Sequence, residues 1–467
     1  MRKFLVLAAV SAVVFYASCS SINYNETIKG PEEKFYQGNY LEAARELLPA
    51  INKKSNSQLL FMMEAGYMLH AGGNFADSNK ALLPAGKLAK IIPTSITQHA
   101  GALLTNNSTL NYKGEDFEKV LVHMYLGINF MMLGKYESAG VEFKLVNEEL
   151  EKIRNEQDGS ARYKQNIMAK YLTASAYEMI GEKEKDMDDL EYAYKELEQI
   201  YALNPRLSLV HEDLVRLSKR LGYDDDVAKW SAISRRHGGQ SYANSGEFLV
   251  IFQSGLSAIK RSRGKLLDDA TMKASINVAL NGISLEGGVT IAAILAVLAN
   301  AENPIPYFDA RSDQISFLQL RVGNQTFRTT MLEDISSTAV QNLKDDYNSL
   351  KLQVAAGIVT KAAASILAGI IAKELAEQLG AKKGLGSLLG TLAGAGTGIA
   401  LFSQIGPDLR SWHTLPAKLH VGRIMLPPGK HHVTIQYIGP AGILTTKTME
   451  IEIKKGEKTI FNTRTLI

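Results

Sequence analysis

The chain of 467 residues carries a single cysteine, Cys19, near its start. One cysteine cannot form an internal disulfide, so its chemistry is not that of a structural cross-link. A free exposed thiol is also a liability in an oxidising compartment. The position of Cys19 therefore predicts a covalent modification of this sulfur, with a stray thiol as the alternative.

The residues before Cys19 have the order of an export signal. Arg2 and Lys3 give a basic start, an uncharged run continues to Ala17, and small residues precede the cysteine. This order resembles a bacterial lipoprotein signal, in which lipid is attached to the sulfur before cleavage. Tyr16 departs from that pattern, because an aliphatic residue usually stands three positions before the cysteine. We expect Cys19 to carry the lipid.

The start of the processed chain predicts an attachment to a membrane. Several acyl chains on Cys19 would give the stable anchoring that one chain cannot give. Ser20, unlike an aspartate there, is expected to permit transfer to the outer membrane of a diderm bacterium. The periplasmic face of that membrane is the expected location. We interpret residues 1–18 as the signal peptide and residues 19–30 as a polar tether.

A second group with chemical potential is Asp408, Arg410 and Trp412. The two charged side chains could bind a ligand. They could also form an ion pair that closes an inserted helical segment onto a sheet, with Trp412 packed beneath. We favour this structural interpretation.

The remaining candidates for chemistry are weak. Adjacent residues of a strand point to opposite faces, which argues against a metal pair at His431 and His432. The acidic run at 224–226 lacks the further oxygen ligands of a calcium loop. No nucleophile elbow, phosphate-binding loop or ligand cluster is present in the sequence. We expect a protein without enzymatic activity, metal or cofactor. The scattered histidines without metal-ligand spacing are His70, His99, His123 and His211.

Composition indicates a globular chain. Hydrophobic residues make up 46 % and charged residues 21 %, and the length suggests two to three domains. The formal net charge of +4 is close to balance. This argues against nucleic-acid binding, which requires a concentrated basic surface.

Residues 31–240 follow a helical pattern with a repeated unit. Gly38, Gly73 and Gly134 are each followed two residues later by an aromatic residue and then by a small one, and Gly181 and Gly222 mark weaker copies. Glycine supplies the tight turn after a first helix, and the small residue lets the second helix approach closely. The pattern resembles tetratricopeptide repeats, whose period is about 34 residues. A plain helical bundle is the alternative.

Residues 246–467 predict strands around a helical insertion. Alternation is clearest near the end, where apolar and polar residues exchange places through residues 433–437 and 449–454. Earlier apolar runs at 248–252, 315–322 and 419–424 also favour strands. We expect an α+β protein, with a helical repeat array followed by a small antiparallel β domain that contains an inserted helical hairpin.

The insertion, about 332–406, is the most unusual stretch. Residues 332–352 predict an amphipathic helix and residues 354–379 an apolar one. Residues 385–406 carry no charge and could reach ~33 Å as a helix, enough to cross a bilayer core. A helical hairpin within a soluble domain is favoured over insertion into a membrane or self-association. The glycines that recur at every fourth position, as in a glycine zipper, are Gly386, Gly390, Gly394 and Gly398.

Four blocks resemble a largely uncharacterised family of bacterial tetratricopeptide-type envelope lipoproteins. The most specific block runs from Asp408 to Pro416, and its sequence is DLRSWHTLP. No enzymatic residues are established for that family, and the resemblance implies none here. The other blocks are 112–136, 171–178 and 247–260.

These observations predict a non-catalytic scaffold of the cell envelope. The lipid on Cys19 would hold it at a membrane, and the helical repeats would bind one or more envelope proteins. The alternative is a subunit of an export or pore assembly that uses the glycine-rich segment as a membrane or oligomer contact. A homo-oligomer is left open, and nucleic acid is not expected as a partner.

Overall fold

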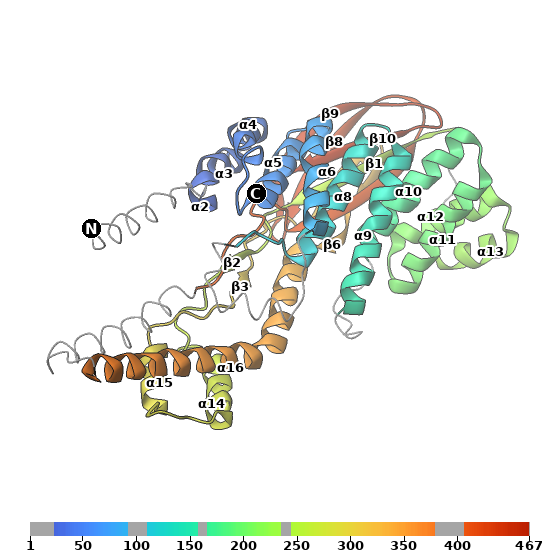
Figure 1. The fold of residues 1–467 in the computed structure, drawn as a ribbon. Helices are drawn as coiled ribbons and strands as arrows, with labels where there is room; N and C mark the ends of the chain where they lie inside the picture. The colour runs from blue at the N-terminus through green and yellow to red at the C-terminus, as the bar shows by residue number, and fades with distance from the viewer. Residues whose placement is uncertain (1–22, 92–109, 157–165, 235–243, 379–405, 467) are drawn as a thin grey trace.

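The computed structural model describes residues 23–91, 110–156, 166–234, 244–378 and 406–466 (Figure 1). In these residues an array of antiparallel helices is followed by two four-stranded sheets and a helical arm. The architecture is therefore α+β. Cys19 lies outside the described residues.

The described part of the helical array contains five pairs of helices. The first helices of the pairs are α3 (Lys29–Tyr36), α5 (Gln58–Ala71), α8 (Asp116–Met132), α10 (Ile167–Glu184) and α12 (Ser208–Leu221). The second helices are α4 (Tyr40–Ile51), α6 (Phe75–Ile91), α9 (Tyr136–Glu156), α11 (Met187–Leu203) and α13 (Asp224–Ile233). A short helix, α2 (Tyr24–Thr27), precedes the array.

The repeated glycines make the predicted turns. Gly38, Gly73, Gly134 and Gly222 all have a positive φ, between 70° and 82°, immediately after a first helix. Glycine adopts this left-handed conformation without the steric penalty of a Cβ. The predicted role of Gly181 is wrong, because it lies inside α10. Its missing side chain instead makes room for Leu190 of α11.

The predicted tether is wrong from residue 24 onward. Asn23 caps α2 through its side chain, which accepts a hydrogen bond from the backbone N–H of Asn25. Tyr24 and Ile28 are buried in the main core. The prediction relied on the polar composition of this stretch and overlooked two aromatic or apolar side chains that are spaced to face the array. Because these side chains are buried, the segment packs on the array.

The described residues of the second part of the chain contain ten strands. One sheet, sheet A, has the order β10-β1-β7-β6, and another, sheet B, has the order β5-β4-β8-β9; β2 and β3 form a separate pair. The strands are β1 (Gly246–Ser254), β2 (Ile259–Arg261), β3 (Tyr307–Asp309), β4 (Phe317–Val322), β5 (Gln325–Arg328), β6 (Thr330–Asp334), β7 (Lys418–Leu426), β8 (Gly429–Gly439), β9 (Gly442–Ile453) and β10 (Lys458–Arg464).

The sequence predicted an antiparallel β domain, but sheet A also contains one parallel pair of strands. β1 pairs antiparallel with β7 but parallel with β10. The two partners leave β1 in the interior of the sheet, and all nine of its residues are buried. A strand that is covered on both faces has an apolar run instead of an alternation, which explains the sequence of β1.

The molecule has three layers. Leu249 and Ile251 on one face of β1 belong to the core shared with the helical array. Phe248, Val250 and Phe252 on its other face pack against sheet B. Sheet A is therefore the middle layer, and the helical array and the β region share one continuous core.

The insertion begins later than predicted and forms an arm. Leu332 lies in β6, and a single helix, α16 (Ile335–Gln378), replaces the two predicted helices. Its distal part packs on α14 (Ala270–Gly282) and α15 (Ile291–Leu298), which have a hydrophobic core of their own. Figure 1 shows this arm leading away from the sheets. Residues 379–405, with all four glycines of the predicted zipper, lie outside the described residues.

One helix in the described part of the chain has the length and composition to cross a membrane. The stretch Leu350–Ile371 of α16 contains 22 residues with a mean hydropathy of 1.9. One third of the most apolar window is buried in the protein.

Candidate functional site

The structure brings three of the predicted site residues together. Asp408, Arg410 and Trp412 lie on the segment that leads into β7 and contacts the helical array. This docking segment, residues 408–416, lies between the array, sheet A and α16. It is the candidate site.

Arg410 joins the docking segment to two loops of the array. Its Nη2 lies 2.7 Å from Asp408 Oδ2 and also donates to the carbonyl oxygen of Leu110 at 3.0 Å. Its Nη1 donates to the carbonyl oxygen of Asn56 at 3.1 Å and to Ser57 Oγ at 3.2 Å. The predicted ion pair is present, but it closes the segment onto the array and not the insertion onto the sheet.

Trp412 is buried beneath this contact. Its backbone N–H donates to Glu118 Oε1 at 2.7 Å, and its ring meets Tyr67 and Tyr125 edge-on. The other oxygen of Glu118 accepts from the hydroxyl of Tyr112. Burial, together with the negative charge of Glu115, raises the pKa of Glu118 to about 7.

A second buried carboxylate holds the next residues. Glu64 accepts a hydrogen bond from the backbone N–H of His413 at 2.6 Å and from the hydroxyl of Thr414. It also accepts from the hydroxyl of Tyr24 at 2.9 Å. Burial raises the pKa of Glu64. Two carboxylates on neighbouring first helices thus fix the backbone of the docking segment.

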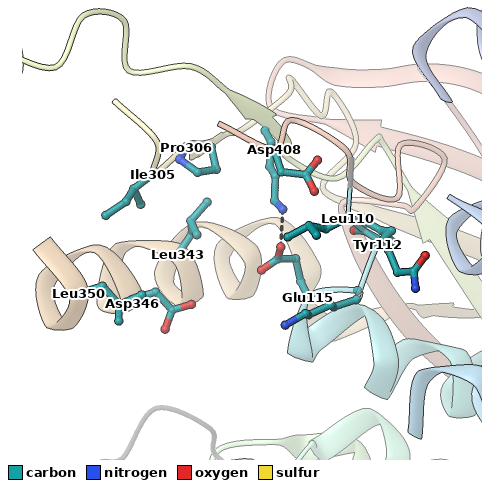
Figure 2. A pocket seen from close by; sticks show the side chains of 13 residues that line it. Leu110, Tyr112, Glu115, Ile305, Pro306, Leu343, Asp346, Leu350 and Asp408 are labelled. Carbon is teal, nitrogen blue, oxygen red and sulfur yellow. Dashed lines mark hydrogen bonds and ion pairs between the residues drawn. The ribbon is translucent and has the colours of Figure 1, made fainter. Parts of the chain in front are cut away.

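A cavity of about 110 Å³ lies beside Asp408, where the array, α16 and the β2–β3 region meet. Figure 2 shows apolar side chains on opposite walls and carboxylates around them. It is smaller than the roughly 300–1,000 Å³ of a typical small-molecule site. It is closer in size to an amino-acid side chain. Its labelled walls are formed by Leu110, Tyr112, Glu115, Ile305, Pro306, Leu343, Asp346, Leu350 and Asp408.

Two lysines also line the cavity and differ in their environments. Lys260 is buried and forms an ion pair with Glu115. Burial would lower the pKa of Lys260, but Glu115, Asp408 and Glu118 together raise it. Lys113 lies nearer the surface, and burial lowers its pKa. Lys113 is therefore the cation at this cavity that a partner could approach.

A network of buried charges forms a second contact between the array and sheet A. Lys458 of β10 lies 2.6 Å from Glu247 of β1 and 3.6 Å from Glu178 of α10. Arg423 of β7 pairs with Asp213 of α12. Burial alone would raise the pKa of Glu247, but the neighbouring cations, Lys458 first, hold it well below its usual range. The network joins the array to sheet A and is not an open site.

His70 of α5 is the centre of a third, uncharged contact. Its Nδ1 lies 2.6 Å from Asn129 Oδ1, and its Nε2 lies 2.7 Å from Gln253 Nε2 and 3.2 Å from Asn462 Nδ2. The amides donate to Nε2, so Nδ1 carries the proton. Burial lowers the pKa of His70 to about 4, which keeps the imidazole neutral.

The three contacts all use the first helices of the array. Eleven of the 14 residues of α5, 13 of the 17 of α8 and 13 of the 18 of α10 are buried. Repeat arrays commonly bind partners on the surface that such helices form. Here the chain's own β region and docking segment occupy that surface, so it is not open to a partner.

The described residues contain no group of three or more metal-ligating side chains. The buried carboxylates Glu64 and Glu118 accept hydrogen bonds from the docking segment instead of facing an open cleft. The sequence analysis missed both residues as site residues. A charged residue within the apolar run of α5 was the signal that could have identified Glu64.

No protein-family model and no curated protein sequence matches this chain. Solved structures show partial likeness. A MamA RS-1 double mutant shares 16 % identity with a TM-score of 0.30, over 46 % of this chain and 93 % of that chain. A kinesin light chain of TPR-like repeats from Podosopora anserina shares 14 % identity with a TM-score of 0.31, over 45 % and 93 %. A tetratricopeptide repeat protein from Parabacteroides merdae shares 16 % identity with a TM-score of 0.21, over 46 % and 81 %.

Proposed function

We propose that this protein is a non-catalytic scaffold of the bacterial cell envelope, held at a membrane by lipid on Cys19, that binds a protein partner at the cavity beside the docking segment. The observation that carries the binding site is the size and lining of this cavity. A space of about 110 Å³ between apolar walls suits one anchoring side chain of a partner better than a metabolite.

The rim of the cavity supports a protein partner. Leu110 is 40 % exposed at its mouth, and Lys113 lies beside it. A buried apolar anchor surrounded by polar groups is the usual arrangement of an interface centre. Because the face formed by the first helices is filled internally, the array supports this site through its loop at residues 110–115 instead of through that face.

Photo-crosslinking tests the partner site. A photoreactive amino acid at Leu110 in the full chain should give a discrete adduct in the envelope, and Lys113→Glu should abolish the adduct. The same amino acid at Leu83, which is 39 % exposed on α6, is the matched control. Equal adducts from both positions, or an adduct at 110 that Lys113→Glu does not change, would contradict the proposal.

Intact mass spectrometry of the membrane-extracted protein tests the anchor. The expected mature chain begins at Cys19 and carries the mass of several acyl chains. A chain that starts elsewhere, or a bare thiol at Cys19, would exclude lipid anchoring while leaving the partner site unaffected.

The second candidate is a subunit of an export or pore assembly. The observation that favours it is the apolar stretch Leu350–Ile371, which has spanning length. In that case, replacing Gly390 and Gly394 by leucine should abolish assembly. The same monomer in parent and variant, measured by analytical ultracentrifugation in detergent, would exclude the assembly.

A further inference from the structure

The arm formed by α14, α15 and the distal part of α16 has a sequence that is poor in charge. Residues 270–299 contain two charged residues, Lys273 and Glu286, and residues 352–372 contain one, Lys361. The whole chain is 21 % charged. Surfaces in contact with water usually carry many more charges, so this composition points to a surface that is not fully exposed to water.

The arm also exposes large apolar side chains on each of its three helices. Val278 of α14 is 62 % exposed and Ile291 of α15 is 43 % exposed. Leu352 and Ile371 of α16 are 52 % and 55 % exposed. These four residues define the arm surface. Other residues of the same helices fill the separate core of the arm. The four exposed side chains are therefore not needed for that core.

The dimensions of the arm suit a bilayer. The 22 residues from Leu350 to Ile371 extend ~33 Å as a helix, close to the ~30 Å of a hydrocarbon core. Val354 and Ile358 are buried against α14 and α15. These contacts favour a helix that lies in the membrane interface with its two companions over one that crosses alone.

The placement of the arm also favours a contact with a bilayer. In Figure 1 both α2 and the distal end of the arm lie in the left half of the view. Three residues separate Cys19 from Asn23, which is four steps along the chain, so a lipid on Cys19 would hold Asn23 within ~14 Å of the bilayer. Beyond the arm, residues 379–405 contain only two charged residues, both lysines.

We propose that the arm surface binds a lipid bilayer and lies in its interfacial region, as a second membrane contact beside the amino-terminal anchor. This inference rests on the proposed envelope location, but it does not depend on the lipid itself. Apolar side chains on three packed helices would enter the boundary between headgroups and acyl chains. The arm would thereby fix the orientation of the scaffold relative to the membrane.

The experiment uses the mature chain from residue 19 with Cys19→Ser, which retains every residue that the structure describes. Val278→Cys then provides a unique labelling position for an environment-sensitive fluorophore. On mixing with vesicles of phosphatidylethanolamine and phosphatidylglycerol, we expect a blue shift of emission and flotation of the protein with the vesicles. Ile443→Cys, on β9 and 58 % exposed, is the matched label, and its emission should not change.

A charge variant completes the test. Leu352→Glu with Ile371→Glu should weaken vesicle binding at least about tenfold, because charge is unfavourable in the interface. Val141→Glu, at a residue 54 % exposed on α9, should leave binding unchanged.

Four outcomes would overturn the proposal. They are unchanged emission from position 278, full binding by the double glutamate variant, a stable dimer buried at the arm, and a label at 278 that is already in an apolar environment without vesicles. The last outcome would show that another part of the same chain covers the arm. Absence of lipid on Cys19 would disprove the anchor alone, because this experiment is carried out without it.

Discussion

Arg410 shows why the docking segment requires an arginine. Its planar group reaches one carboxylate, two backbone carbonyl oxygens and a hydroxyl at the same time. A lysine has the charge but lacks this fixed fork of donors. The interaction therefore depends on geometry as well as on charge.

We expect Arg410→Ala to lower the free energy of unfolding by about 3 kcal/mol, because it leaves Asp408 and two carbonyl oxygens without their partner. Arg410→Lys should retain part of this stability and remain below the parent. Urea unfolding measures both. Arg220→Ala, which removes an exposed pair with Glu182, should change stability by no more than about 0.5 kcal/mol. Equal effects at 410 and 220 would contradict this account.

His70 predicts a pH dependence. Its pKa is lowered from 6.5 in the unfolded chain to about 4 in the fold. Above pH 6.5 the imidazole is neutral in both states, so it does not affect stability. As the pH falls from 6.5 toward 4, the unfolded chain binds a proton that the folded chain does not, and the free energy of unfolding decreases. The decrease should reach about 3 kcal/mol. Urea unfolding at several pH values should show a smaller acid loss for His70→Gln than for the parent; parallel curves would contradict the assignment.

At this scale the sequence revealed one side of the contact between the docking segment and the array. Asp408, Arg410 and Trp412 stand close together in a distinctive motif, so the sequence singled them out. Their partners lie about 300 or more positions away, as Glu118 does for Trp412. A single sequence contains no direct signal of such a distant pairing, so the hydrogen-bonding role of Glu118 appeared only in the structure.

Helix pairs show two separate uses of glycine. Gly134 ends α8 with a φ of 70° and has open space around it. Gly127 lies inside α8, where a Cβ would overlap the ring of Phe143. The first glycine is required by backbone conformation and the second by packing.

We expect Gly134→Ala to destabilise the protein by about 1 kcal/mol and Gly127→Ala by about 2 kcal/mol or more. Adding Phe143→Leu should restore part of the loss at position 127, because the smaller side chain relieves the overlap, and none of the loss at position 134. A double-mutant cycle by urea unfolding measures the coupling. Rescue at both positions would contradict the distinction.

Lys185 follows α10 at the place where the other four first helices are followed by a glycine. Its φ of 58° makes it the one non-glycine residue with a positive φ in the described part of the chain. Lys185→Gly should therefore raise stability by about 0.5–1 kcal/mol. Thermal unfolding measures this gain. Lys183→Gly, inside the last turn of the same helix, should have the opposite effect.

The sequence predicted long elements better than short ones. The glycine and aromatic spacing predicted several turns of the array, and alternation predicted β8 and β9. It missed β10, whose residues are mostly half-buried and do not alternate clearly. It divided α16 into two helices although no proline or glycine interrupts residues 335–356. Weak periodicity, and not a physical break, caused that error.

For the whole molecule, the shared core couples the array to the β region. The main core combines Tyr67 and Tyr125 of the array with Leu249, Val421 and Trp412 of the second half. A helical array without the second half would expose the apolar and charged side chains that now meet sheet A. The two parts should therefore unfold together.

We expect calorimetry of the full mature chain to show one transition for the array and both sheets. A chain limited to residues 23–234 should lack a cooperative transition and should bind the dye ANS, because its inner face is uncovered. A cooperative transition of this shorter chain near the melting temperature of the full chain would show that the array is an independent domain.

The parallel pairing of β10 with β1 has a consequence for biosynthesis. Glu247 leaves the ribosome 211 positions before Lys458, the cation that neutralises it. Until Lys458 is made, the central strand lacks one neighbour and its carboxylate lacks the cation that lowers its pKa most. The nascent polypeptide would thus stay incompletely folded until the last strand of sheet A has been translated.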